Sequence, residues 1–268
     1  MARRYKKTLG LALGSGGPRG LAHIGVIKTL LKHNIPIDYL SGSSIGSWVG
    51  AHYALYEDIE KLEEFTAGKR QEKLFSFLEP SFKGGIIRGD RSEKMLNDWL
   101  GGASFKDLKI PLRIVATDLI TGQAIVFDHG NLAFASRASM AVPGIFKPVK
   151  FNKYLLVDGG ISNPVPDDVA KQMGSDVVVA VNLDFFGDYE FAKVNPKFSE
   201  VSIRTMDIMR QYLAEYCLRE ADFIVRPDLS QYGSWTKYFF GNSGPQIIEI
   251  GARETEKIIP KLKDALLF

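Results

Sequence analysis

The 268-residue sequence predicts an α/β fold with a mainly parallel central sheet, and three observations carry this prediction. Short apolar runs alternate with segments whose apolar residues have helical spacing. In the first two repeats of this pattern, a glycine-rich turn lies between the apolar run and the helical segment that follows it. The run Asp176–Leu183 (DVVVAVNL) has the nearly continuous apolar character of a strand buried on both faces. Alternating strands and helices form crossover units, in which the strands are parallel.

The N-terminal part of the chain contains the clearest alternation. Residues 71–91 follow neither period, and we expect a cap or lid there. The regular elements expected before residue 101 are strands at Thr8–Leu13 and Tyr39–Ser41 and helices at Leu21–His33, Ile45–Tyr56, Asp58–Lys69 and Ser92–Leu100.

The remaining elements follow from the same two periods and from Gly and Pro positions. We expect a turn at Asn152-Lys153 and a single final helix over Pro245–Leu266. The other expected elements are strands at Leu112–Asp118, Gln123–Phe127, Phe151–Val157, Asp176–Leu183 and Phe223–Arg226 and helices at Leu132–Met140, Pro166–Met173 and Glu200–Ala221.

Composition and charge exclude several classes of protein. The net charge is +3, but four basic residues lie within residues 1–7, so the rest of the chain carries about −1 and shows no nucleic-acid footprint. The single cysteine, Cys217, excludes an internal disulfide and a cysteine-cluster metal site and suits a reducing compartment. No apolar run approaches the roughly 18 residues of a membrane span. We therefore expect a cytoplasmic protein.

The segment Gly42-Ser43-Ser44-Ile45-Gly46 is a G-x-S-x-G motif between an expected strand and an expected helix. A nucleophilic serine needs such a sharp turn, where crowding admits only small flanking residues such as Gly42 and Gly46. Ser44 would then stand at a helix N-terminus, whose N–H groups favour developing negative charge. The alternative is a serine-rich helix cap without catalytic function.

The segment Gly14–Gly20 (GSGGPRG) follows the first expected strand. Consecutive N–H groups in such a turn form a concavity that suits a phosphate or a reaction oxyanion. A dinucleotide-binding G-x-G-x-x-G fits poorly, because Arg19 stands where the last glycine is needed, and no Gly-Lys-Ser/Thr completes a Walker A motif. A purely structural tight turn is the other alternative.

Asp158 follows an expected strand and precedes two glycines, so its carboxylate is a candidate base for a serine. Taken alone, the segment fits an ordinary Asp-Gly turn better. No histidine follows Asp158, so the order Ser, Asp, His of the α/β-hydrolases is not met. We expect structural or surface roles for the four histidines, which are His23, His33, His52 and His129.

Together these segments resemble the patatin-like phospholipase family, a group of serine lipid acyl hydrolases with a Ser-Asp dyad. Small bacterial single-domain members are the most similar, which implies a three-layer α/β/α patatin-like fold over residues 8–268, preceded by a basic N-terminal extension, residues 1–7. Four blocks in family order carry the resemblance: Gly14–Gly20, Gly42–Gly46, Ala138–Pro148 (ASMAVPGIFKP) and Asp158–Pro166 (DGGISNPVP).

The resemblance implies roles for individual residues. Ser44 would be the nucleophile and Asp158 its base, while the N–H groups of Gly16 and Gly17, with help near Arg19, would form the oxyanion hole. One residue departs from the family pattern, because Ser15 replaces the first glycine of a triplet and restricts positive φ there. The resemblance implies neither a metal nor another cofactor.

Fatty acyl esters of lipids are the substrate class that the resemblance implies. Apolar residues within 74–87 and aromatic residues within 232–240 are candidates for an acyl pocket or for peripheral contact with the inner face of a membrane, and the basic residues Arg3, Arg4, Lys6 and Lys7 are candidates for contact with anionic lipid. Two rival hypotheses are a catalytically weak regulatory or lipid-binding protein and a nucleotide-binding protein that uses the first glycine loop. The sequence does not specify an oligomeric state.

Overall fold

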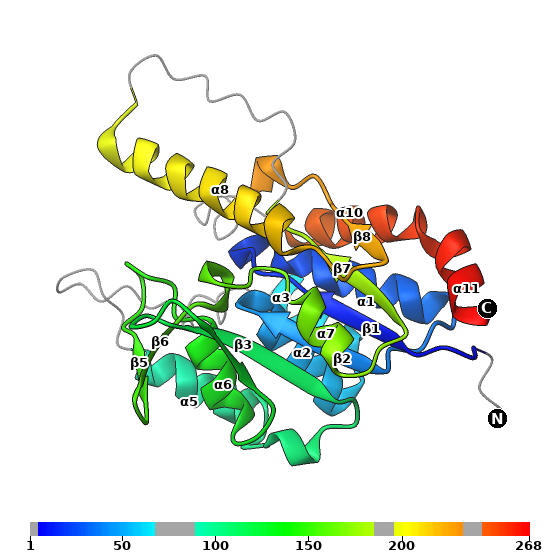
Figure 1. The fold of residues 1–268 in the computed structure, drawn as a ribbon, viewed down its shortest axis with the longest axis horizontal. Coiled ribbons are helices and arrows are strands. Elements are labelled where there is room, and N and C mark those ends of the chain that lie inside the picture. Colours follow the sequence, from blue (N-terminus) through cyan, green and yellow to red (C-terminus); the bar gives the residue numbers. More distant parts are fainter. Residues whose placement is uncertain (1–4, 68–88, 185–195, 233–242) are drawn as a thin grey trace.

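The computed structural model describes residues 5–67, 89–184, 196–232 and 243–268, which are coloured in Figure 1. In these residues, eight strands form one mixed sheet in the order β5-β6-β3-β2-β1-β7-β8, and β4 pairs with β3 beside this path. Most of the segments in which we expected a lid, an acyl pocket or membrane contact, together with Arg3 and Arg4, lie outside the described residues.

Strands β3, β2, β1, β7 and β8 are parallel, and β4, β5 and β6 add antiparallel pairings beyond β3. This arrangement confirms the predicted mainly parallel α/β fold. Strand β3 pairs in parallel with β2 and carries a hairpin partner, β4, on its other side. The parallel strands are β1 (Leu9–Leu13), β2 (Tyr39–Ser43), β3 (Leu112–Asp118), β7 (Val177–Val181) and β8 (Phe223–Val225). The antiparallel strands are β4 (Ala124–Phe127), β5 (Val149–Phe151) and β6 (Tyr154–Val157).

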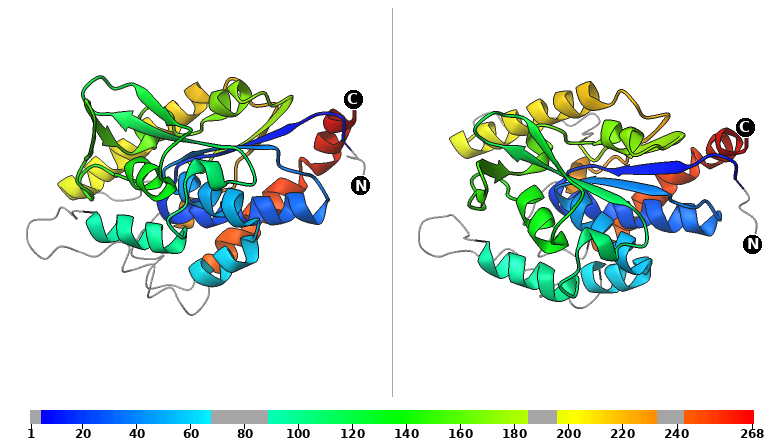
Figure 2. Two further views of the ribbon diagram at one scale, coloured as in Figure 1. Left: turned by 90° about the horizontal axis from the view of Figure 1, so that it is seen from below. Right: turned by 60° about the horizontal axis from the view of Figure 1, so that its bottom comes forward.

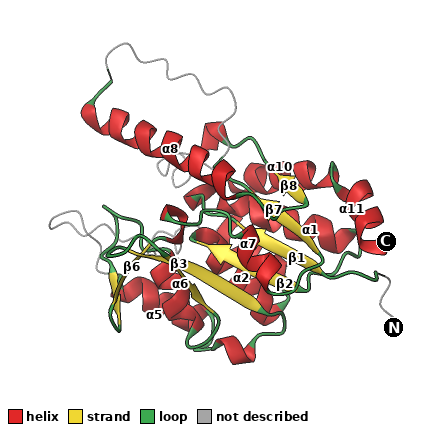
Figure 3. Cartoon of the chain, viewed as in Figure 1, coloured by secondary structure: helices red, strands yellow, loops and turns green. Residues whose placement is uncertain are grey.

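The neighbouring strands β1 and β7 send alternate side chains into two separate cores. Leu9, Leu11 and Leu13 of β1 join the larger core, whereas Ala12 joins a smaller core on the opposite face with Val178 of β7. Side chains that alternate between faces require cover on both sides, so the sheet lies between two helical layers. Figures 2 and 3 show these helices on the two faces of the strands.

The helices divide between the two cores. The larger core takes residues from α1 (Ala22–Lys32), α2 (Ile45–Tyr56), α3 (Ile59–Ala67), α5 (Asp90–Trp99), α6 (Leu132–Ser139), α10 (Gly244–Glu256) and α11 (Ile259–Leu267). The smaller core takes residues from α7 (Asp167–Gln172) and α8 (Phe198–Cys217). The three-layer arrangement that the sequence predicted is therefore present.

Two parts of the chain differ from the expectations. The expected single final helix is two helices, because α10 ends at Glu256 and α11 begins at Ile259, immediately before Pro260, whose missing N–H suits a helix start. The expected strand Phe151–Val157 is a hairpin of two strands, β5 and β6. The turn predicted at Asn152-Lys153 joins them and is confirmed, with Asn152 in the left-handed region at a φ of 51°.

The end of the basic N-terminal extension is attached to the domain. Tyr5 is buried, and the N–H groups of Lys6 and Lys7 donate to the carbonyl of Leu266 in α11. These residues precede β1 and lie at the end of the sheet opposite to the carboxyl ends of the parallel strands, as the N-terminus in Figure 1 shows. Lys6 and Lys7 are therefore distant from the turns that follow β1 and β2.

Candidate active site

Ser44 lies at the tight turn between β2 and α2, where the sequence predicted it. Its φ of 53° and ψ of −123° are unusual for a residue with a side chain, and such backbone conformations cost about 1–3 kcal/mol unless the surroundings enforce them. Gly42 and Gly46 flank the turn, and a Cβ at Gly46 would overlap the Leu13 carbonyl of β1. Helix α2 therefore approaches β1 backbone to backbone, and no side chain fits at Gly42 or Gly46.

The Ser44 hydroxyl donates a hydrogen bond to Oδ2 of Asp158 at 2.5 Å, although 114 residues separate the two in the chain. Both side chains are almost covered, with 6% of Ser44 and 7% of Asp158 exposed. Asp158 follows β6 and is fixed by its own backbone, since its N–H donates to Ala141 and its carbonyl accepts from the Thr117 hydroxyl. The structure thus brings together the two residues that the sequence singled out.

Burial raises the pKa of Asp158 to about 6, because desolvation disfavours the charged carboxylate. The hydrogen bonds from Ser44 and from the Gly160 N–H act in the opposite direction, as does the positive charge of Arg210. A carboxylate with this pKa is ionised near neutral pH and is still a better proton acceptor than an ordinary aspartate.

Ser139 supports the serine turn, and the sequence analysis did not single it out. The Ser44 N–H donates to Ser139 Oγ at 2.8 Å, and that hydroxyl donates to the Val115 carbonyl of β3 at 2.6 Å. Ser139 is the last residue of α6 and belongs to the block Ala138–Pro148. Its place in that block was the one feature of the sequence that could have indicated its role.

The glycine loop after β1 lies directly against this pair. A Cβ at Gly160 would lie 2.8 Å from Ser15 and 3.0 Å from Oδ1 of Asp158, so the loop and the carboxylate both lie next to Gly160. Gly17 has a φ of 55°, which favours glycine. Within the described residues, no acceptor takes the N–H of Gly16 or Gly17. The loop therefore offers two backbone donors beside Ser44 and Asp158.

Ser15, which departs from the family pattern, makes two hydrogen bonds of its own. Its hydroxyl donates to Oδ2 of Asp184 at 3.0 Å, and its N–H donates to the Pro164 carbonyl at 2.7 Å. Ser15 is not among the residues with positive φ, so its side chain creates no strain in the loop. The expected limit on loop geometry therefore does not apply.

Asp184 is the centre of a buried ionic cluster that the sequence analysis did not predict. Its Oδ1 accepts from Arg19 at 2.9 Å and from Arg210 of α8 at 2.7 Å, and the Asp184 side chain is fully buried. Arg19 also donates from Nε to the Gly16 carbonyl, so the cluster holds the glycine loop from behind. Neither Asp184 nor Arg210 belongs to a motif, and only the fold brings them together with Arg19.

The histidines have structural or surface positions, and no hydrogen bond in the described residues links their rings to Ser44 or Asp158. His23 is buried, and desolvation lowers its pKa to about 4, so its neutral ring donates to the Gly14 carbonyl at 2.8 Å. No group of three or more potential metal-binding side chains occurs in the part of the chain that the structure describes. The helices described there include none that is long and apolar enough to cross a bilayer.

The sheet order, the strained serine turn and the adjoining glycine loop define a class: a three-layer α/β protein with a patatin-like fold. The family model for patatin-like phospholipases matches residues 11–171, which contain all four sequence blocks. The chain therefore belongs to the patatin-like phospholipase family.

Relatives extend this similarity beyond the matched segment. An uncharacterized NTE family protein of Mycobacterium bovis is 37% identical over 175 residues, covering 65% of this chain and 48% of the relative. The human patatin-like phospholipase domain-containing protein 6 is 29% identical over 247 residues, covering 84% of this chain and 18% of that protein. The chain thus spans at most about half the length of these relatives.

A solved structure supports the fold independently. The crystal structure of VipD from Legionella pneumophila superimposes with a TM-score of 0.67 at 14% identity and covers 97% of this chain and 67% of that one. At this identity the likeness concerns the fold, and it includes the C-terminal part that the family model does not match.

We predict that Asp158→Asn is stabilising at high pH. The folded-state pKa of about 6 lies above the ordinary value of 3.8, so the wild type loses stability as the pH rises through this range. From pH 5 to pH 8 the wild type should lose about 1.5 kcal/mol relative to the variant. Urea unfolding at both pH values measures this difference, and a pH-independent difference would contradict the prediction.

We predict that Asp184→Asn destabilises the fold by about 3–5 kcal/mol, because Arg19 becomes a buried charge without its counterion. The double variant Arg19→Gln/Asp184→Asn should recover part of this loss. The exposed pair Lys94–Asp98 supplies the control, since Asp98→Asn should cost less than about 1 kcal/mol. Urea unfolding decides, and similar losses for Asp184→Asn and Asp98→Asn would refute the role of the cluster.

Proposed function

We propose that this protein hydrolyses fatty acyl esters of lipids through a Ser44–Asp158 dyad. The single observation that carries the proposal is the buried 2.5 Å hydrogen bond from the Ser44 hydroxyl to Asp158 at a strained strand-to-helix turn. Strained backbone at a nucleophile positions its hydroxyl for attack. Family membership supports an acyl ester of a lipid as the substrate class.

The first half of the reaction transfers the acyl group to the protein. Asp158 takes the Ser44 proton while Oγ attacks the ester carbonyl carbon, and the carbonyl oxygen becomes an oxyanion. The N–H groups of Gly16 and Gly17, which no acceptor in the described residues uses, supply the oxyanion hole. Collapse of the tetrahedral intermediate expels the alcohol, which takes the proton from Asp158 and leaves acyl-Ser44.

The second half releases the fatty acid. Asp158 takes a proton from water, the resulting hydroxide attacks acyl-Ser44, and the same glycine N–H groups stabilise the second oxyanion. Ser44 leaves with the proton held by Asp158, which restores both residues. One carboxylate serves both halves, and its pKa of about 6 suits both taking and returning a proton near neutral pH.

The buried cluster behind the loop maintains this arrangement. Arg19 holds the Gly16 carbonyl and Asp184, so we assign it to positioning the oxyanion loop rather than to contact with the oxyanion. Loss of one oxyanion donor typically costs about 3–4 kcal/mol of barrier, so small displacements of this loop matter.

A fluorophosphonate probe tests the nucleophile, and we expect covalent labelling of the wild type that is lost in Ser44→Ala. The matched control is Ser43→Ala, which changes the neighbouring serine and should keep the label. Labelling that persists in Ser44→Ala would show that another residue is the nucleophile. A wild type that resists the probe would favour the catalytically weak lipid-binding protein.

The pH dependence of ester hydrolysis tests the base. We expect kcat/KM for a p-nitrophenyl acyl ester to rise with pH, with its midpoint near the Asp158 pKa of about 6 and about a tenth of the plateau at pH 5. Because the Arg210 charge lowers the pKa of Asp158, Arg210→Gln should move the midpoint to higher pH. A profile that is flat from pH 5 to pH 8 would rule out Asp158 as the base.

A further inference from the structure

Helix α8 has its polarity reversed relative to an ordinary surface helix. Arg204, Asp207 and Arg210 are partly buried on the side that faces the body, whereas the apolar residues on the opposite side are exposed. One charged residue of α8, Glu215, is exposed and pairs with Arg226. Surface helices of globular proteins normally turn their apolar stripe inward. The exposed apolar residues of α8 are Val201, Met206, Ile208, Met209, Tyr212 and Tyr216.

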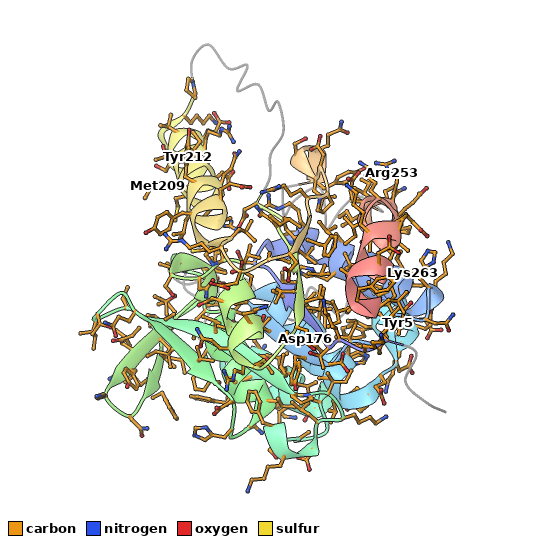
Figure 4. The ribbon with its side chains drawn as sticks, turned by 45° about the vertical axis from the view of Figure 1, so that its right-hand side comes forward. Tyr5, Asp176, Met209, Tyr212, Arg253 and Lys263 are labelled. Atoms are coloured by element: carbon orange, nitrogen blue, oxygen red, sulfur yellow. The ribbon has the colours of Figure 1, made fainter. Side chains whose placement is uncertain are left out.

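This stripe runs along the outer side of α8, and four of its six residues lie in the second half of the helix. Met209 is 65% exposed and Tyr212 75%, and Figure 4 places both far from Tyr5 and Lys263. Helix α8 is anchored through its second half, where Ala214 is buried in the smaller core. Its first half extends beyond the sheet at the end where the parallel strands finish (Figures 1 and 2).

Exposed apolar side chains continue from α8 around the Ser44–Asp158 pair. Ile161 lies three residues after Asp158, and Cys217 of α8 contacts the carbonyl of the next residue, Ser162. Leu119 and Ile120 follow β3 and are 53% and 68% exposed. In the described residues, every exposed large apolar side chain other than Leu31, Val126 and Phe268 lies on α8 or in these two loops.

The hairpin at the same end adds positive charge. Residues 141–157 contain Lys147, Lys150 and Lys153, all exposed, and no Asp or Glu. The turn after β3, residues 119–123, carries no charge. Figure 1 shows the β5–β6 hairpin at the same end of the sheet as the first half of α8.

We propose that this end of the molecule, comprising the α8 stripe, Leu119, Ile120, Ile161 and the three hairpin lysines, docks on an anionic lipid bilayer. We name it the docking face. Tyrosine and methionine insert at the boundary of a bilayer, and lysines gain from anionic headgroups. A second copy of this chain is a poorer occupant, because association through two such faces would bring lysine-bearing hairpins together.

Docking in this orientation brings the lipid to the catalytic pair. Ser44 directly follows β2 and the Leu119 loop directly follows β3, so both lie at the carboxyl ends of two neighbouring parallel strands. An ester bond drawn from the bilayer would reach Ser44 without crossing the molecule. The proposal deepens the proposed lipid hydrolysis and rests on it for the identity of the surface as lipid.

Vesicle flotation with the Ser44→Ala protein tests the docking face without any turnover. The vesicles are phosphatidylcholine alone or phosphatidylcholine with about a third phosphatidylglycerol, and we expect stronger binding to the anionic mixture. Met209→Asp/Tyr212→Asp should weaken binding to the anionic vesicles at least about tenfold. Lys150→Gln/Lys153→Gln should weaken it about fivefold for each lysine and leave binding to neutral vesicles unchanged.

Matched controls lie away from the docking face. Phe268→Asp changes an exposed apolar residue and Lys106→Gln an exposed lysine, and both should bind as the parent does. All variants change exposed residues, so unchanged thermal unfolding verifies their folds. Absent binding by the parent protein, or equal binding by the Met209/Tyr212 variant, would overturn the proposal.

Sedimentation of the same proteins tests whether a second copy of this chain, rather than a bilayer, covers the docking face. A dimer that Met209→Asp/Tyr212→Asp dissolves, without vesicle binding by the parent, would assign the face to a second copy and overturn the proposal. Fluorophosphonate labelling of Ser44 is a separate measurement, so failure of docking and failure of the proposed hydrolysis give different results.

Discussion

The hydrogen bond between the Ser44 hydroxyl and the Asp158 carboxylate is the constraint on which the arrangement of this protein depends. It joins segments 114 residues apart and places a carboxylate where little water reaches. A carboxylate in such a place needs donors, and the Ser44 hydroxyl and the Gly160 N–H supply them. The positive charge of Arg210 acts in the same direction, yet burial still raises the Asp158 pKa to about 6. The surroundings thus leave the charge of the carboxylate only partly compensated, which suits the proposed role of a base that also returns its proton.

The strained turn at Ser44 is held by contacts from three directions. Gly46 allows α2 to approach the backbone of β1, Ser139 binds the Ser44 N–H from the side of β3, and Asp158 takes the hydroxyl. Each contact alone is worth about 1 kcal/mol, comparable with the cost of the unusual dihedral angles. The conformation persists because several contacts act together. The same glycines that permit this approach make the turn recognisable in the sequence.

Sequence reasoning identified the parts of the fold and of the candidate site that local patterns specify. Periodicity predicted the alternating strands and helices, and small residues around Ser44 and Asp158 indicated tight turns at the ends of two strands. Asp184 and Arg210 could not be found this way, because their partners are distant in sequence and a buried ionic cluster leaves no periodic signal. The break between α10 and α11 was missed for a related reason, since apolar spacing continues across it and only Pro260 indicated the start of a new helix.

The reversed polarity of α8 follows from the demands of the site. Arg210 of α8 is a second cation on Asp184 besides Arg19, so the side of the helix that carries Arg210 faces the body. A helix whose charged side is committed inward must present its remaining side outward, and in α8 that side is apolar. Polar residues on that side would form hydrogen bonds with water and would leave the ionic cluster unchanged. The cluster alone therefore does not explain why Met209 and Tyr212 are there. A lipid surface does explain them, because it turns an exposed apolar stripe from a liability into a source of binding free energy.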